Sequence, residues 1–218
     1  AIYSIYPDGI NNKNYKLKSL MKSLDVTYIL MNDERAMTNV NTPEEYREIL
    51  KDSKKGSTII NIVASCSNVG KTTLIEGLIK ELRKRGYSLS TIKHDVHGFD
   101  MDKEGKDTWR HRKAGAEQVC ISSKNRFAMI KEVEEELALD SIIDNISETD
   151  FIIVEGYKKS NLRKIEVARE EKGRKIITPR DKIIAVASDF DPLIEGVEWV
   201  DINDYEKLAD IVEKERYL

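Results

Sequence analysis

The sequence predicts an α/β fold in which a mostly parallel sheet is flanked by helices, and two observations carry this prediction. Strand-like and helix-like segments alternate over residues 58–218, as in proteins whose parallel strands are joined by helical crossovers. One strand-like run, residues 59–63, also leads through a loop of small residues into a helical pattern with Leu74, Leu78 and Leu82 four residues apart. The rest of the domain is predicted to be arranged around this strand, loop and helix.

The loop and the start of this helix have the order of a phosphate-binding P-loop. In such a loop, backbone N–H groups and the positive end of the helix surround a polyphosphate. Lys71 is predicted to lie between the β- and γ-phosphates, and the Thr72 hydroxyl to bind Mg²⁺. The fold is therefore predicted to be that of a P-loop NTPase. The predicted phosphate-contacting residues are Ser67, Asn68, Val69, Gly70, Lys71, Thr72 and Thr73.

One position departs from the P-loop pattern, because Ser65 stands where the first glycine is expected. Glycine gives that position freedom in φ, which a serine lacks. Ser65 must therefore adopt an allowed backbone conformation or carry strain.

Residues 1–50 form a separate short unit, a small N-terminal α/β piece. They predict a helix over 13–24, a strand over 26–31 and a second helix with Thr42 as its N-cap. Two helices and one strand bury too little to be stable alone, so we expect this piece to pack on the main domain or on a part that is absent. Because the sequence opens with Ala1 rather than Met, and Ile2-Tyr3 is typical of the middle of a strand, we expect the chain to begin inside a larger fold. A polar linker over 51–57 is predicted to separate this piece from the main domain.

Beyond the P-loop, hydrophobic periodicity and turn residues set the remaining predicted elements. In chain order, these are the P-loop helix ending near Gly86, a strand over 88–93, a helix over 107–113, a hairpin of strands 118–122 and 126–131, a helix over 132–146, strands over 151–154, 164–169 and 183–187, a strand around 199–200, and a helix over 204–214.

Composition narrows the functional classes. The 36 basic and 39 acidic residues leave a net charge of −3, so no broad attraction to nucleic acid is predicted. Cys66 and Cys120 are the two cysteines and form no C-x-x-C pair, which favours a reducing compartment over a disulfide framework. No apolar run approaches the roughly 18 residues of a membrane span, and no secretory pattern opens the chain. We therefore expect a cytoplasmic protein without a membrane partner.

A carboxylate ends the apolar strand over residues 151–154. In P-loop proteins this place lies beside the Mg²⁺, so Glu155 is the candidate acid for a metal-bound water, and Gly156 lets the chain turn away beside the phosphates. An ordinary acid in a strand-to-loop turn is the alternative. Asp150 opens the same strand and is predicted to be a surface residue.

The segment 93–102, directly after a strand, is rich in titratable groups. Loops at this edge of a nucleotide-binding sheet face the ligand, so Asp95 is predicted to join Thr72 and Glu155 around the metal. Two interpretations of the segment are open. His94 and His97 could bind a transition metal, or the segment acts as a switch that senses the γ-phosphate, which the sequence favours.

Asp189 ends the strand over 183–187 in a similar way. A carboxylate here is suited to accept hydrogen bonds from N1 and N2 of guanine, which adenine does not offer. A turn or helix-cap aspartate is the alternative at this position.

Together these motifs resemble one family, the GTP-binding protein of molybdopterin-guanine dinucleotide biosynthesis, the B protein of that pathway. They occur in the family's order across about residues 58–215. The matching stretches are Ser67 to Leu74, Lys93-His94-Asp95, Phe99 to Lys103, Gly105 to Thr108, Lys113 to Ala116, Val154 to Lys158, Lys164 to Val167, and Ala185 to Asp189.

Residues 1–50 resemble a different protein, the C-terminal end of the molybdenum cofactor guanylyltransferase, or A protein. The resemblance lies in Ala1-Ile2-Tyr3 and in residues 39–46. The Gly-rich nucleotide loop and metal-binding acids of that enzyme are not in this sequence. The resemblance implies a fusion in which this piece is a remnant without transferase activity.

The resemblance implies a GTP-binding adaptor with weak hydrolysis, which would assist the guanylyltransferase in attaching GMP to molybdopterin. It implies GTP and Mg²⁺ as ligands, and the guanylyltransferase, molybdopterin and molybdoenzyme apoproteins as partners. Similar proteins are dimers, so a homodimer is expected. Lys71 and Glu155 are the residues expected to support hydrolysis. The sequence shows no obvious general base or arginine finger, which agrees with slow turnover.

Two other functions remain open from the sequence. A P-loop small-molecule kinase would need an arginine-bearing lid over the γ-phosphate, and residues 172–175 are a poor candidate for one. A metallochaperone GTPase would use His94 and His97 as ligands, but the usual cysteine- or histidine-rich sets are absent from the sequence.

Overall fold

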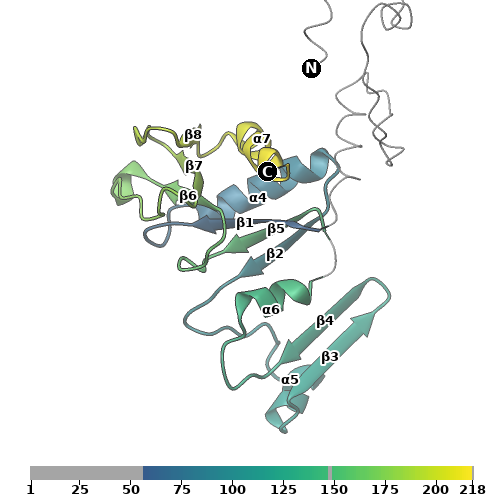
Figure 1. Cartoon of the computed structure of the whole chain (residues 1–218). Coiled ribbons are helices and arrows are strands. Elements are labelled where there is room, and N and C mark those ends of the chain that lie inside the picture. Colours follow the sequence, from purple (N-terminus) through teal and green to yellow (C-terminus); the bar gives the residue numbers. More distant parts are fainter. Residues whose placement is uncertain (1–55, 147–148, 218) are drawn as a thin grey trace, which may run out of the picture. The chain divides into compact units, whose positions relative to one another are not determined.

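A computed structural model describes residues 56–146 and 149–217 of the chain. Their centre is a six-stranded sheet with the order β2-β5-β1-β6-β7-β8, in which all neighbouring strands are parallel (Figure 1). The predicted α/β class with a mostly parallel sheet is confirmed. The strands are β1 (Thr58–Val63), β2 (Leu89–Lys93), β5 (Phe151–Glu155), β6 (Lys164–Ala168), β7 (Ile183–Ser188) and β8 (Glu198–Asp201).

The remaining elements are one hairpin and the helices. The hairpin pairs β3 (Gln118–Ser123) with β4 (Arg126–Lys131) as a separate antiparallel sheet. The helices are α4 (Lys71–Lys84), α5 (Asp107–Lys113), α6 (Leu139–Asp144) and α7 (Tyr205–Glu215), with the short 3₁₀ turn η2 (Glu170–Lys172) after β6.

The two faces of the sheet bury two hydrophobic clusters. Along β5, Phe151 and Ile153 pack into the cluster that α4 and α7 cover, whereas Ile152 and Val154 pack into the one that α6 covers. Because strand side chains alternate between faces, a strand covered on both sides must be apolar at every position. This explains the unbroken apolar run that the sequence shows here.

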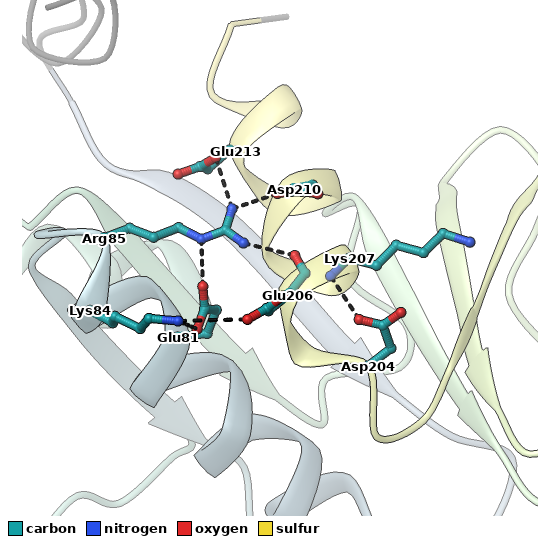
Figure 2. Close-up of polar contacts among 8 residues, drawn as sticks. All are labelled: Glu81, Lys84, Arg85, Asp204, Glu206, Lys207, Asp210 and Glu213. Carbon is teal, nitrogen blue, oxygen red and sulfur yellow. Dashed lines mark hydrogen bonds and ion pairs between the residues drawn. The ribbon is translucent and has the colours of Figure 1, made fainter. Parts of the chain in front are cut away.

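Helices α4 and α7 lie side by side on one face and are joined through Arg85 (Figures 1 and 2). The Arg85 guanidinium donates to Glu81 in its own helix and to the carboxylates of Asp210 and Glu213 in α7, at 2.6 to 3.1 Å. Asp204 caps the start of α7 by accepting from the Lys207 backbone N–H at 3.0 Å. One side chain at the end of α4 thus holds the C-terminal helix in place.

A second set of polar contacts, around Asp150, connects the amino ends of β2 and β5. Asp150 accepts from the N–H and hydroxyl of Ser88, both at 2.7 Å, and from the Arg216 guanidinium at 3.0 Å. Arg216 is itself buried, with 2% of its surface exposed. Asp150 is therefore a partly buried structural acceptor and differs from the surface residue that the sequence suggested.

Most element boundaries agree with the sequence prediction, and one helix does not. The helix 107–113 and the strand 126–131 are found with the predicted bounds, and α4 ends beside Gly86, which has φ of 85°. The predicted helix over 132–146 was wrong, because α6 covers only Leu139–Asp144. Its first part holds four glutamates, and like charges four residues apart, such as Glu132 and Glu136, disfavour a helix.

The predicted helix over 13–24, the strand over 26–31, the helix start at Thr42 and the linker up to residue 55 lie outside the described residues. No helix within the described ranges is both long and apolar enough to span a membrane.

Candidate nucleotide-binding site

The predicted P-loop joins β1 to α4 at the carboxyl edge of the parallel sheet. Gly70 is the N-cap of α4, with φ of 95°, a conformation that suits glycine. No side chain caps the helix, and its first turn contains no acidic residue. The N–H groups and the positive end of α4 are therefore not neutralised by these local groups, which is the arrangement that binds an anion.

Ser65 adopts an ordinary backbone conformation. Within the described ranges, the non-glycine residues with positive φ are Asn68, Tyr157 and Leu193, so Ser65 is not among them. Of the two possibilities that the sequence left open, an allowed conformation is the one observed. The left-handed position in this loop is taken by Asn68, with φ of 59°. Asparagine tolerates this region better than most residues.

The predicted magnesium acid lies next to the P-loop strand. β5 pairs with both β1 and β2, so Glu155 is the partner of Ile62 on one side and of Lys93 on the other. The His94 N–H donates to the Glu155 carbonyl at 3.0 Å, which joins the next segment to this edge. The sheet order therefore brings the P-loop, Glu155 and the start of the segment after β2 to a common edge.

Asp95 is an exposed residue at this edge. Its Oδ1 accepts from the His97 N–H at 2.9 Å, which forms a tight turn. Across the described ranges, no group of three or more His, Cys, Asp or Glu is arranged to hold a metal ion. Mg²⁺ in nucleotide sites is bound by one or two protein groups together with phosphates and waters. A site of Thr72, Glu155 and Asp95 therefore stays a prediction.

His94 has structural neighbours of its own. Its Nε2 lies 2.9 Å from a carboxylate oxygen of Glu136, and its ring stacks on Tyr157 with centroids 4.3 Å apart. His97 contributes its backbone to the Asp95 turn. The two histidines are thus placed in different local contacts.

The predicted switch-like segment is attached to α5 through Arg112. The guanidinium contacts Asp100 at 3.0 Å and Asp102 at 3.2 Å, and Thr108 also donates to Asp102 at 2.7 Å. A third contact reaches Glu132 after the hairpin, at 2.8 Å. These contacts connect Asp100 and Asp102 to α5 and to Glu132, although the residues from Val96 to Met101 are exposed.

Asp189 directly follows β7, the second strand from β1 on the side opposite to Glu155. Its Oδ1 accepts from the Glu170 N–H at 2.9 Å, and its Oδ2 faces Arg169 at 3.5 Å. The backbone hydrogen bond from Glu170, with a smaller effect of Arg169, lowers the pKa of Asp189 below its ordinary value. The carboxylate is therefore ionised at neutral pH and oriented by these two contacts.

Arg169 is a residue of this site that the sequence did not reveal. It follows β6 directly, and its Nε donates to the Val69 carbonyl of the P-loop at 3.3 Å. Its Nη2 lies 3.4 Å from the place that a Cβ would occupy on Gly70. The available signal was the position of Arg169 at the carboxyl end of a strand, but only the sheet order shows that this strand is the neighbour of β1.

Comparisons with known proteins agree with one another. The family model described as molybdopterin guanine dinucleotide synthesis protein B matches residues 59–189. The molybdopterin-guanine dinucleotide biosynthesis adapter protein of Escherichia coli (strain K12) is 42% identical over 166 residues, which cover 72% of this chain and 94% of that protein. The protein of the same name from Haemophilus influenzae (strain ATCC 51907 / DSM 11121 / KW20 / Rd) is 36% identical over 153 residues, covering 69% and 85%.

Solved structures give the same result for the fold. A crystal structure of molybdopterin-guanine biosynthesis protein B matches with a TM-score of 0.56 at 29% identity, covering 72% of this chain and 98% of that one. The crystal structure of Bacillus subtilis MobB matches with a TM-score of 0.58 at 24% identity, covering 72% and 97%. At 24% identity, the similarity to the Bacillus subtilis structure concerns the fold alone.

Proposed function

Because the chain belongs to the family of molybdopterin guanine dinucleotide synthesis protein B, we propose that it is a GTP-binding adaptor in the conversion of molybdopterin to molybdopterin guanine dinucleotide. The proposal includes GTP with Mg²⁺ as the ligand and slow hydrolysis. The relatives from Escherichia coli and Haemophilus influenzae carry the name of adapter proteins of this biosynthesis, which favours an adaptor over a small-molecule kinase or a metallochaperone.

The observation that carries the nucleotide part is the amino end of α4. Gly70 starts the helix without a side-chain cap, and Glu155 ends the neighbouring strand. In this proposal the N–H groups of residues 67–73 and the Lys71 ammonium bind the phosphates. Thr72 and Glu155, with Asp95, hold the Mg²⁺ and its waters. Asp189 accepts from the guanine.

The proposed partner is the molybdenum cofactor guanylyltransferase, with molybdopterin and molybdoenzyme apoproteins as further ligands of the assembly. Slow hydrolysis fits this role, since an adaptor is required to hold nucleotide rather than to turn it over. The proposed remnant over residues 1–50 adds no transferase activity of its own.

We also infer that two copies of the chain associate through the β3–β4 hairpin. Ile121 and Ala128 are paired across the hairpin and therefore lie on the same face. Phe127 and Met129 flank Ala128 along β4 and lie on the opposite face. Ile121, Phe127 and Met129 are 58%, 65% and 52% exposed. A two-stranded hairpin buries little apolar surface by itself, and a second copy of the chain supplies an apolar surface that covers Phe127 and Met129. A Phe127→Asp variant should then sediment as a monomer where the unmodified chain sediments as a dimer.

The nucleotide proposal is tested by calorimetric titration with GTP and with ATP, each with Mg²⁺. We expect GTP to bind well and ATP poorly, and Lys71→Ala to abolish binding. Lys80→Ala is the matched control, because Lys80 is an exposed lysine further along the same helix. Equal or tighter ATP binding would overturn the assignment of Asp189 and favour a kinase. Absence of any binding by the unmodified chain would overturn the whole proposal.

A further inference from the structure

The loop that follows Glu155 turns back toward the P-loop. Its third residue, Lys158, donates from Nζ to the carbonyl oxygen of Ser65 at 3.2 Å. Ser65 is the first position of the P-loop pattern, so the Lys158 ammonium lies at the P-loop although it comes from the loop after β5, the strand next to β1 in the sheet.

The start of this loop is held in an unusual backbone conformation. Gly156 has φ of 93° and Tyr157 has φ of 45°, a left-handed conformation that is rare for a tyrosine. A Cβ on Gly156 would lie 3.0 Å from the Cβ of His94. Such conformations persist only where the surroundings enforce them, and they are concentrated at functional sites.

Contacts with β1 and with His94 hold the backbone of Gly156 and Tyr157 in this conformation. The fully buried Asn61 donates from Nδ2 to the Gly156 carbonyl at 3.0 Å, and the Gly156 N–H donates to the Ile62 carbonyl at 3.1 Å. The Tyr157 ring stacks on the His94 ring. The direction in which the chain leaves Glu155 is therefore fixed on both sides.

The far end of the loop is held by a buried lysine. Lys164, 1% exposed, donates to the carbonyl of Ser160 at 2.6 Å, to the hydroxyl of Ser160 at 3.1 Å and to the carbonyl of Leu162 at 3.0 Å. Burying an ammonium costs free energy that these hydrogen bonds only partly offset. Asn61 and Lys164 are both buried polar residues, and the hydrogen bonds of both hold this one short loop in its conformation.

We propose that this loop places Lys158 at the terminal phosphate of a nucleotide bound in the P-loop. An ammonium has three donors, and the exposed Lys158 uses one of them for the Ser65 carbonyl. A triphosphate held by the P-loop brings acceptor oxygens of high charge to the same place, where charge-assisted hydrogen bonds form. The chain thereby supplies, from the loop after β5, a second cation beside Lys71.

This inference rests on the proposed GTP binding and adds a specific expectation. A cation at the terminal phosphate distinguishes GTP from GDP. Lys158→Ala should weaken GTP binding about tenfold, the effect of one lost charge-assisted hydrogen bond, while GDP binding changes less than about twofold. Lys158→Arg should recover part of the GTP affinity, because it restores the charge.

The test is calorimetric titration of the full chain with GTP and GDP in the presence of Mg²⁺. Lys159→Ala is the matched control, since it removes the adjacent exposed lysine, and it should bind both nucleotides like the unmodified chain. If Lys158→Ala does not fold, Lys158→Gln replaces it, and thermal unfolding without nucleotide verifies the fold of each variant.

Three results would overturn the inference. Lys158→Ala with unchanged GTP affinity would remove Lys158 from the site. An equal loss for GTP and GDP would show that it does not act at the terminal phosphate. A similar loss in Lys159→Ala would show a general charge effect. In all three the unmodified chain still binds GTP, so the proposed function stands; failure of the unmodified chain to bind would overturn both.

Discussion

The Arg169 guanidinium donates from Nε to the carbonyl oxygen of Val69 over 3.3 Å, so the first residue after β6 is bonded to the P-loop. The same guanidinium faces Asp189 at 3.5 Å. One side chain therefore connects the proposed phosphate-binding loop with the proposed guanine-reading carboxylate. Changes at either end are expected to affect the other.

Replacing this arginine should weaken nucleotide binding without removing a phosphate ligand. In Arg169→Met, the Val69 carbonyl and Asp189 both lose their charged partner, and we expect GTP affinity to fall about five- to tenfold by calorimetry. Arg110→Met is the control, because Arg110 is an exposed arginine on α5. Unchanged affinity in Arg169→Met would show that the P-loop holds its conformation without this contact.

The proposed base recognition leads to a change of specificity. Asparagine at position 189 still accepts from the N1–H of a purine, but it presents an amide donor where guanine has its own amino donor. Xanthine carries an oxygen at that place. We therefore expect Asp189→Asn to bind XTP at least tenfold more tightly than GTP, the reverse of the unmodified chain, in a competition assay. The same preference for GTP in both proteins would show that Asp189 does not contact the base.

The buried Lys164 predicts a dependence of stability on pH. Burial, with a further contribution from Lys182, lowers the pKa of Lys164 below 10.5, its ordinary value. Between the folded pKa and 10.5 the unfolded chain binds more protons, so this group makes the free energy of unfolding rise with pH. At lower pH the burial cost is present in full, and above 10.5 it is absent.

Urea unfolding of the unmodified chain and of Lys164→Met at pH 7, 8.5 and 10 measures this effect. The free energy of unfolding of the unmodified chain should rise with pH relative to that of the variant, because the variant has no ammonium whose burial cost is relieved. A difference between the two proteins that stays constant or falls as the pH rises would contradict the depressed pKa.

The contact between α4 and α7 predicts a loss of stability in Arg85→Met. The Arg85 side chain is 16% exposed, and its loss leaves the carboxylates of Asp210 and Glu213 close together without their cation. We expect the free energy of unfolding to fall by about 2 kcal/mol, less than for a fully buried pair. Lys84→Met, at a lysine that is 70% exposed, should change it by less than about 0.5 kcal/mol. Equal effects of the two variants would contradict a special role for Arg85.

Local patterns predicted much of this fold. The helix 107–113 and the strand 126–131 were found with their predicted bounds, because polar turn residues flank each segment. The helix over 132–146 was predicted too long, because its apolar spacing was given more weight than the four glutamates in its first part. Two of these, Glu132 and Glu136, contact Arg112 and His94, which lie elsewhere in the chain.

The strand, loop and helix of the proposed site could be predicted because they are continuous in sequence. The P-loop and the start of α4 follow one another along the chain, so their placement could be predicted from spacing alone. Arg169 and Lys158 could not be found in this way, because their contacts with Val69 and Ser65 join positions 100 and 93 residues apart. Such contacts depend on the order of strands in the sheet, which spacing does not determine.

The exposed hairpin has a consequence for inheritance when two copies associate through it. A chain whose P-loop is inactivated by Lys71→Ala would still fold its β3–β4 hairpin, which lies in a separate sheet. When mutant and normal chains are made in the same cell, random pairing would place a defective copy in most of the dimers. Where the function needs both copies of the dimer, such an allele would interfere with the normal one, and adding Phe127→Asp to the mutant chain would remove the interference.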